Sequence, residues 1–500
     1  MFMHPRIAAT ALAVVILTSG GFAQTATLLD AVKAGDRSTV ERLLTRKPDI
    51  NVHGSDGTTA LHWAVRGDDL AMTQLLVGAG ADVGALTRTG VTPLALAAAN
   101  GNAAIVNALL TAGANPNTAS TEGETALMTA VRSGSAAAVK VLLARGADPN
   151  ARENWQGQTA LMWAAAVNAP AVVSVLVEAG ADVNARSIVL PGQPRLPRAE
   201  GVAAQSSHSN FPHGGFTPLL FAAREGALDA ARALTSAGVA VNLADPDGIA
   251  PLSMAIINAH YDLAALLIEK GANVNASDRV GRTPLFFATD MHTLEWLFSR
   301  PVPKASGELD SPDIVVKLLD QGANVNAGLT GRPFILHHNA TGNRTLIEGS
   351  TAFMKATTTS DMELMRVLLA HGADPNIKTR NNTTPLMAAA GLNWVDISSL
   401  GSEEASIEAI TLCLERGADI NAANDLGETA MHGAAQRGAD KVVRFLAAHG
   451  ANLEPKDKQG RTPMDEAIGQ INESDGDNVR RPERRSTQAV LTELIAAKAR

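Results

Sequence analysis

The sequence has few aromatic residues and almost no cysteine. Phe, Trp and Tyr make up only 3% of its 500 residues, whereas one compact domain of this length would need more large rings to fill its core. Its apolar residues are mainly Ala, Leu and Val. Helices rich in Ala pack their axes closely, which suits thin layers stacked on one another. The composition therefore disfavours a single large core and favours a repeat array.

The one cysteine, Cys413, excludes an internal disulfide, so stability must come from packing. It stands between Leu412 and Leu414, at a position that another repeat fills with Leu142. This setting predicts a buried, inert thiol and not a catalytic one.

The chain also lacks an excess of basic residues. Its 42 Lys and Arg stand against 50 Asp and Glu, and removal of Arg6 with an N-terminal signal leaves 41 against 50, a net charge of -9. A nucleic-acid-binding protein normally has a basic surface that neutralises phosphates. The small basic cluster at 480–485 is interrupted by Glu and Pro and is interpreted as a solvated loop. No nucleic-acid partner is expected.

Only one long apolar run is present, from Ile7 to Leu17. Arg6 precedes it, and the small residues Gly21 and Ala23 follow it, which is the order of a secretory signal peptide cleaved after Ala23. A membrane span needs roughly 20 apolar residues, and this run is too short. We expect export to the periplasm or beyond the cell, with no membrane insertion after the signal is cleaved.

Motifs of common enzymes are missing as well. The sequence contains no Gly-rich phosphate loop, no H-E-x-x-H, no C-x-x-C and no G-x-S-x-G, each of which would place a particular catalytic or cofactor-binding group. We therefore predict no catalysis and no cofactor.

What the chain does contain is one motif, Thr-Pro/Ala-Leu, in 11 copies. The successive intervals are 33, 33, 34, 58, 33, 33, 68, 33, 45 and 33 residues, so the basic period is 33, as in stacked supersecondary units. The copies begin at Thr59, Thr92, Thr125, Thr159, Thr217, Ala250, Thr283, Thr351, Thr384, Thr429 and Thr462.

Each copy has a physical interpretation. The Thr side chain caps a helix, and a Pro such as Pro93 takes the first helical position, where its missing N–H is tolerated. A second helix such as 139–144 follows, and it ends at a Gly such as Gly146, where a helix terminus favours a left-handed residue. A turn such as 278–281, with Asp and Gly at its ends, then reverses the chain. The unit is two helices and a hairpin finger.

These residues resemble the ankyrin repeat, whose pattern is D-x-x-G-x-T-P-L-H-x-A-A followed by V-x-x-L-L-x-x-G-A-D-V-N-A. The stretches 56–64 and 270–276 match it almost letter for letter. The resemblance implies an all-α ankyrin-repeat solenoid of helix-turn-helix units with β-hairpin or loop fingers, with about 11 repeats and an N-terminal capping helix pair. Only His62 and His432 fill the His position of the pattern, so the bonds made by that residue are expected to be absent or replaced elsewhere.

The intervals divide the chain into segments. In the N-terminal pair, Ser38 and Glu41 fit a capping box. The predicted segments are a signal peptide at 1–23, an N-terminal capping repeat at 24–57, repeats at 58–185, a finger-loop insertion at 186–215, repeats at 216–327 with a helix-loop insertion near 300–312, a finger-loop insertion at 328–349, repeats at 350–461 with a helix-loop insertion near 391–405, and a C-terminal capping repeat at 462–500.

The two finger-loop insertions carry the alternative hypothesis. His208 and His213 lie in the first, and His337 and His338 in the second, so the alternative is a metal-binding or enzymatic site assembled by the loops. Three layers separate the insertions, a distance of roughly 30 Å at about 10 Å for each packed helix layer. Loops on a solenoid edge are also common sites of recognition.

By the resemblance, finger tips and first helices line a concave groove that binds a protein partner. The main hypothesis is thus an exported, monomeric scaffold for protein–protein interaction. Large aromatic side chains and Arg are effective interface anchors, although the aromatic residues also suit packing between layers. The candidate partner-binding residues are Trp63, Trp163, Phe221 and Phe287 at the fifth motif position, and Asn100, Arg132, Arg224, Glu225, Asn258, Gln436 and Arg437 one turn later.

Overall fold

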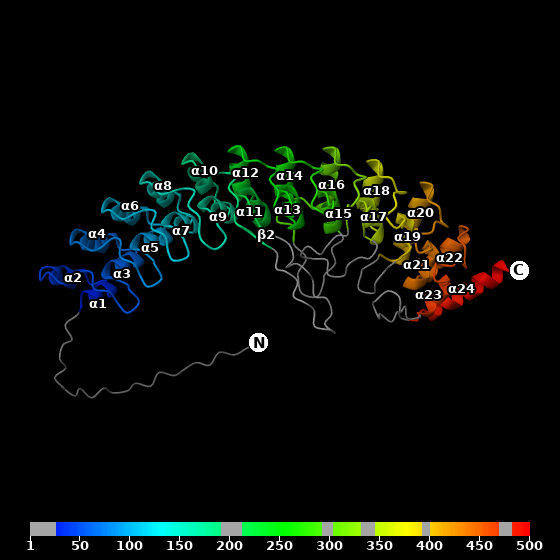
Figure 1. The fold of residues 1–500 in the computed structure, drawn as a ribbon, viewed down its shortest axis with the longest axis horizontal. Helices are drawn as coiled ribbons and strands as arrows, with labels where there is room; N and C mark the ends of the chain where they lie inside the picture. Colours follow the sequence, from blue (N-terminus) through cyan, green and yellow to red (C-terminus); the bar gives the residue numbers. More distant parts are fainter. Residues whose placement is uncertain (1–26, 192–212, 293–303, 332–345, 393–400, 470–482) are drawn as a thin grey trace, which may run out of the picture.

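The chain folds into an arch made of two rows of helices (Figure 1). The computed structural model describes residues 27–191, 213–292, 304–331, 346–392, 401–469 and 483–500. The odd-numbered helices follow the inner side of the arch: α1 (Leu28–Lys33), α3 (Ala60–Arg66), α5 (Pro93–Asn100), α7 (Ala126–Arg132), α9 (Ala160–Ala166), α11 (Pro218–Glu225), α13 (Pro251–Ile257), α15 (Pro284–His292), α17 (Ala352–Thr358), α19 (Pro385–Ala389), α21 (Ala430–Arg437) and α23 (Pro463–Ile468).

Each inner helix is followed by an outer one, and the two form a layer. The outer helices are α2 (Arg37–Leu44), α4 (Leu70–Gly78), α6 (Ala103–Thr111), α8 (Ala136–Ala144), α10 (Pro170–Glu178), α12 (Leu228–Ser236), α14 (Tyr261–Glu269), α16 (Ser311–Asp320), α18 (Met362–Ala370), α20 (Glu403–Glu415), α22 (Asp440–Ala448) and α24 (Arg485–Lys498). The predicted all-α solenoid, with 11 motif layers and an N-terminal helix pair, is confirmed.

Threonine begins the inner helices other than α13, which follows Ala250, as the sequence predicts. The side chain of Thr92 accepts a hydrogen bond from the Ala95 N–H at 3.0 Å, and that of Thr217 accepts one from the Leu220 N–H at 3.2 Å. Gly146 lies just beyond α8 with φ +85°, a conformation that side chains with a Cβ rarely adopt. Local sequence thus fixes where each helix starts and stops.

The predicted capping box at Ser38 and Glu41 is wrong. Helix α2 begins at Arg37, and the Asp36 carboxylate accepts the hydrogen bond from the Thr39 N–H at 3.0 Å. Ser38 instead donates its hydroxyl hydrogen to Asp36 at 2.8 Å. Because Asp36 already satisfies a free N–H of the first turn, the helix starts before Ser38.

Asparagine side chains tie one layer to the next. Asn275 accepts a hydrogen bond from the Asn324 N–H at 2.7 Å and donates one to the Gly322 carbonyl at 3.1 Å. Asn117 makes the same two bonds, to Asp148 and Gly146. These bonds satisfy the ends of outer helices in the following layer, so they fix the spacing between layers.

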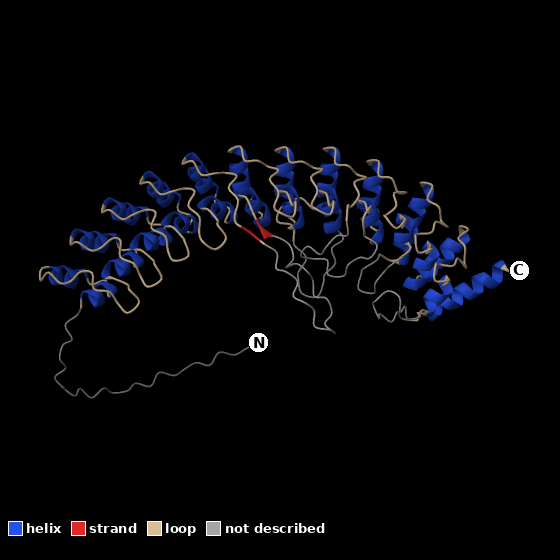
Figure 2. Cartoon of the chain, in the orientation of Figure 1, coloured by secondary structure: helices blue, strands red, loops and turns tan. Residues whose placement is uncertain are grey.

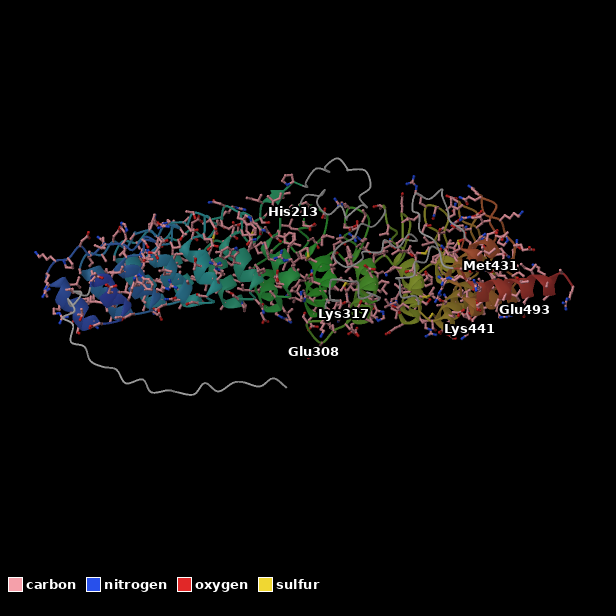
Figure 3. The ribbon with its side chains drawn as sticks, turned by 90° about the horizontal axis from the view of Figure 1, so that it is seen from below. His213, Glu308, Lys317, Met431, Lys441 and Glu493 are labelled. Atoms are coloured by element: carbon pink, nitrogen blue, oxygen red, sulfur yellow. The ribbon has the colours of Figure 1, made fainter. Side chains whose placement is uncertain are left out.

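The fingers are loops with little sheet structure (Figure 2). Single antiparallel bridges join His53 to Thr59 and Ala119 to Thr125. At the base of the first finger-loop insertion, β1 (Val189–Leu190) pairs with β2 (His213–Gly214) in an antiparallel sheet. His213 lies on the finger edge of the arch, opposite Glu308 of the first helix-loop insertion (Figure 3). Residues 192–212, 293–303, 332–345 and 393–400, which include most of the predicted insertions, lie outside the described residues.

A candidate protein-binding surface

The fifth motif position, counted from the motif Thr as position one, lies on the inner helices, and the side chains at this position differ in exposure. Trp63 and Trp163 are half-buried, and both line surface pockets. Phe221 and Phe287 are only 5% and 4% exposed, and they pack inside the solenoid. The two phenylalanines therefore leave the set of partner-contact candidates, while the two tryptophans stay in it.

The structure places two of the three candidate Arg residues over aromatic rings. The Arg132 guanidinium lies 4.9 Å from the ring centre of Trp163, and that of Arg224 lies 5.0 Å from Phe221 and 5.4 Å from Phe216. A cation over the face of an aromatic ring is attracted by the ring quadrupole. Each Arg thus extends a ring toward solvent, and together they form polar and apolar surface of the kind enriched at interfaces.

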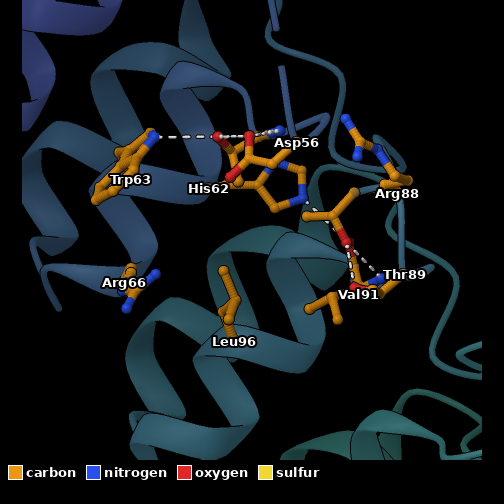
Figure 4. A pocket seen from close by; sticks show the side chains of 10 residues that line it. Asp56, His62, Trp63, Arg66, Arg88, Thr89, Val91 and Leu96 are labelled. Atoms are coloured by element: carbon orange, nitrogen blue, oxygen red, sulfur yellow. Dashed lines mark hydrogen bonds between the residues drawn. The ribbon is translucent and has the colours of Figure 1, made fainter. Parts of the chain in front are cut away.

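A pocket of about 350 Å³ surrounds Trp63 (Figure 4). Two cations of the chain lie over this indole: Lys33 Nζ at 4.8 Å and the Arg66 guanidinium at 5.4 Å. The indole N–H donates a hydrogen bond to the Thr58 hydroxyl at 3.2 Å. The residues that line the pocket have a formal charge of +1, because they include Arg66 and Arg88 but only one carboxylate, that of Asp56. We call this site the Trp63 pocket.

A larger pocket of about 670 Å³ surrounds Trp163, and we call it the Trp163 pocket. Its lining includes a second indole, Trp155, which is 75% exposed at a finger tip. The residues that line it have a formal charge of -2, because they include three carboxylates, from Glu122, Glu124 and Glu153, and one Arg, Arg132. The lining residues are Glu122, Glu124, Arg132, Glu153, Asn154, Trp155, Gln158, Trp163, Ala166 and Val167.

Sequence reasoning missed Trp155. The sequence feature that could have indicated it is the interval of 34 residues from Thr125 to Thr159, which is one residue longer than the period. The extra residue lies in the finger: Asp278 precedes Thr283 by five residues, but Glu153 precedes Thr159 by six. Because Glu is one methylene longer than Asp, Glu153 spans the longer turn and accepts hydrogen bonds from the N–H groups of Trp155, Gln156 and Gln158 at 2.5–3.0 Å.

Other predicted contact residues have structural roles. The Asn100 side chain donates a hydrogen bond to the Val65 carbonyl of the preceding layer at 2.8 Å, and that of Asn258 donates one to the Met254 carbonyl at 2.8 Å. Gln436 is 7% exposed. Arg437 donates to the Ser406 hydroxyl and the Gly401 carbonyl, each at 2.6 Å. Asn100 and Arg437 thus hold neighbouring layers together, Asn258 caps the end of its own helix, and Gln436 is buried.

Glu225 is exposed and pairs with Arg224 at 2.8 Å. Such a surface ion pair contributes little to stability. Both side chains stay accessible to a partner, so Glu225 remains a candidate beside Arg224.

The metal hypothesis rests on four His residues of the finger-loop insertions. Of its four His residues only His213 is described; it is exposed on β2, and His208, His337 and His338 lie outside the described residues. Within the described ranges, no three His, Cys, Asp or Glu side chains form a group able to hold a metal ion. Cys413 is fully buried, and burial raises the pKa of its thiol to about 12, as expected for an inert side chain.

Comparisons with known proteins agree with this geometry. A sequence model described as ankyrin repeats (3 copies) matches residues 28–120, 112–187, 219–328, 304–400 and 399–475. The chain belongs to the ankyrin repeat family.

Similar ankyrin repeat proteins share only part of their length with it. Ankyrin repeat and SOCS box protein 16 of Homo sapiens is 30% identical over 122 residues, 24% of each protein. The B-cell lymphoma 3 protein homolog of Mus musculus is 30% identical over 155 residues, 31% of this chain and 29% of the relative. A transient receptor potential cation channel subfamily A member 1 homolog of Caenorhabditis elegans is 27% identical over 23% of this chain and 9% of the channel. The chain thus spans less than a third of each of these relatives.

Among solved structures, the ankyrin repeat domain of Bcl-3, a member of the IkappaB protein family, is 27% identical. It covers 47% of this chain and 95% of its own chain, with a TM-score of 0.39.

The ankyrin His position is filled at His62, which links two fingers. Nδ1 accepts a hydrogen bond from the Thr59 N–H at 3.2 Å, and Nε2 lies 3.1 Å from the Val91 carbonyl. Since Nδ1 accepts, the neutral ring carries its proton on Nε2 and donates to Val91. Burial lowers the pKa of this imidazole below its ordinary 6.5, although Asp56 and Asp82 oppose the shift.

This lowered pKa predicts acid weakening of the first layer. A group with a lower pKa in the folded state favours the proton-free form, so its stabilisation is complete above pH 6.5 and is lost as the pH falls through the folded pKa. Intrinsic amide exchange slows as the pH falls from 7.5 to 5, and exchange in α3 should slow less than this, which leaves a pH-dependent excess over the intrinsic expectation. In the variant His62→Gln this pH-dependent excess should disappear, and its persistence would contradict the assignment.

Proposed function

We propose that this protein is an exported ankyrin-repeat scaffold that binds a protein partner along the concave side of the arch. The observation that carries the proposal is the repeated arrangement on this side: two pockets at the same motif position, each with an indole and at least one Arg. Trp and Arg are the residue types that most often dominate binding energy at protein interfaces.

Export is supported by the order of residues at the N-terminus, with Arg6, the apolar run from Ile7 to Leu17 and the small residues Gly21 and Ala23. Within the described ranges, the structure contains no helix with the length and hydropathy of a membrane span.

The test is affinity capture from the envelope fraction with the chain lacking residues 1–23, followed by identification of the retained protein by mass spectrometry. In the double variant Trp163→Ala and Arg224→Ala, affinity for that protein should fall by about tenfold or more, since interface anchors of this kind contribute about 2 kcal/mol or more. The melting temperature checks folding, and Arg132→Glu tests the same surface without loss of a ring.

The control is the pair Arg366→Ala and Glu408→Ala, which removes two exposed charges from the outer helices α18 and α20. It should leave the affinity unchanged. Equal affinity of the control and the inner-side variants would reject the concave surface as the binding site.

A further inference from the structure

We infer that the Trp163 pocket binds a cationic side chain, an Arg or a Lys, of the partner protein. The inference rests on the proposed function and names the chemistry of the segment that enters the groove. It comes from a comparison of the two tryptophan pockets, which occupy the same motif position in layers three repeats apart.

The two pockets differ in one cation. Over Trp63, one cation, Lys33, comes from the preceding layer and the other, Arg66, comes from position eight of the same layer. Over Trp163, Arg132 of the preceding layer corresponds to Lys33. Position eight of that layer is Ala166, which lines the pocket. The side chain that would lie over the indole from its own layer is therefore reduced to a methyl group.

The volumes agree with this difference. The pocket with Ala166 measures about 670 Å³ and the pocket with Arg66 about 350 Å³. Pockets of about 300–1,000 Å³ are typical of sites that take a side chain or a small molecule. The space at Ala166 is therefore sufficient for an Arg or Lys side chain supplied from outside.

The charges of the two pockets favour a cation in the larger one. The residues that line the Trp63 pocket have a formal charge of +1, whereas those that line the Trp163 pocket have a formal charge of -2, from three carboxylates and one Arg. One of these carboxylates, Glu153, is bound to N–H groups of the finger. Glu124 pairs with Arg132 at 2.9 Å. Glu122 is exposed at the mouth, where it can pair with an incoming cation. An indole face attracts a guanidinium or ammonium group, and a nearby carboxylate adds an ion pair.

Trp155 adds a second aromatic side chain, on a finger whose backbone is fixed by hydrogen bonds. Its backbone N–H is bound by the Glu153 carboxylate, and Glu153 is 6% exposed. The Asn154 N–H donates to the Glu122 carbonyl at 2.9 Å, and the Ile188 N–H donates to the Gln156 carbonyl at 2.7 Å. The finger is thus fastened on both sides. A finger whose backbone is already ordered loses little backbone entropy when a partner covers it.

The inference can be tested with the chain lacking residues 1–23, labelled with 5-fluorotryptophan and observed by fluorine NMR. The probe is a blocked Gly-Arg-Gly tripeptide, and the Trp155 and Trp163 signals are assigned by single Trp→Phe variants. Both signals should shift saturably, with a dissociation constant on the order of 1–10 mM for a single cationic side chain. The Trp63 signal should stay in place, since its indole already has two cations.

The deciding variant is Ala166→Arg, which supplies the missing arginine from the chain itself and removes no group. It should weaken tripeptide binding by about tenfold or more because the new side chain occupies the space over Trp163. The matched control is Ala99→Arg, which makes the same change at position eight of the layer in which position five is Leu96. Ala99 is exposed, and binding by this variant should equal that of the wild type.

Several results would overturn the inference. They are equal shifts with a Gly-Glu-Gly tripeptide, no shift with the Arg tripeptide, or unchanged binding by Ala166→Arg. Shifts with chitotriose but not with the Arg tripeptide would assign the pocket to carbohydrate.

Failure of the scaffold proposal can be distinguished from failure of the cation site. If the captured partner binds wild type and Ala166→Arg equally but the double groove variant poorly, the scaffold stands and the cation site is rejected. If the tripeptide binds as described but inner-side variants leave partner capture unchanged, the site stands as a cation site and the groove proposal falls.

Discussion

Replacing Phe353 with Ala is expected to lower the free energy of unfolding by about 3–5 kcal/mol. Phe353 is 1% exposed and is among the largest fully buried side chains of the described residues. It lies on α17, which packs against α15, α18 and α19. Removal of the ring loses its burial and leaves a cavity that three neighbouring helices cannot fill without moving.

The loss of stability in Phe353→Ala should be confined to the layers near α17. In a solenoid each layer contacts only its neighbours, so stability is close to a sum of layer and interface contributions. Amide hydrogen exchange in Phe353→Ala should therefore quicken first in α15 to α19, and α3 to α8 should keep their protection. Chemical denaturation measures the size of the loss.

The matched control is Met464→Ala, at the same motif position of the last layer, where the side chain is half-buried. Its cost should be below about 2 kcal/mol because less surface is uncovered. Equal costs for the two variants would contradict the view that burial at this motif position determines the loss.

The repeat frame could be predicted because its signals are local. Thr at the start of an inner helix and Gly at the end of an outer one act through bonds and backbone angles within a few residues. The 33-residue period then aligned these signals across the chain. The wrong capping prediction at Ser38 also arises from local signals. Asp36 and Ser38 are both residue types that cap helices, and in the structure Asp36 caps α2.

The candidate surface could be predicted only in part, because exposure depends on the neighbouring layer. Position five predicts that a ring faces the inner side, but Phe221 is covered by Phe216, whose ring centre lies 5.6 Å away. Asn100 looked like a contact residue, yet its amide reaches back to the preceding helix. Trp155 arises from a one-residue change in a finger turn, which no consensus pattern contains. These features need the contacts between layers.

Replacing Arg282 with Ala should also be strongly destabilising, by about 3–5 kcal/mol, because it leaves a buried charge without its partner. The Asp278 carboxylate is 0% exposed and the Arg282 side chain 7% exposed, and Nε of Arg282 lies 2.7 Å from Oδ2 of Asp278. The guanidinium also lies 4.9 Å from the ring centre of Phe287. Denaturant titration of the variant measures the loss.

Two further variants separate the buried charge from the contact with the ring. Arg380→Ala removes the Arg of a finger ion pair whose side chains are 77% and 45% exposed, and it should cost less than about 1 kcal/mol. Adding Asp278→Asn to Arg282→Ala keeps an oxygen for the backbone N–H groups of Val280 and Arg282 but removes the charge. This should recover about half of the loss or more, because the uncompensated charge is its main source.

No recovery in the double variant would instead assign the loss to the contact between Arg282 and Phe287. Recovery or no recovery in the double variant shows whether the aromatic ring of Phe287 contributes to stability through its contact with Arg282. At Phe287 an Arg of the finger closes over the ring and is itself buried against Asp278, so ring and cation belong to the scaffold. At Trp163 the covering Arg132 is exposed and position eight is an alanine, so the same motif position is left open to a partner.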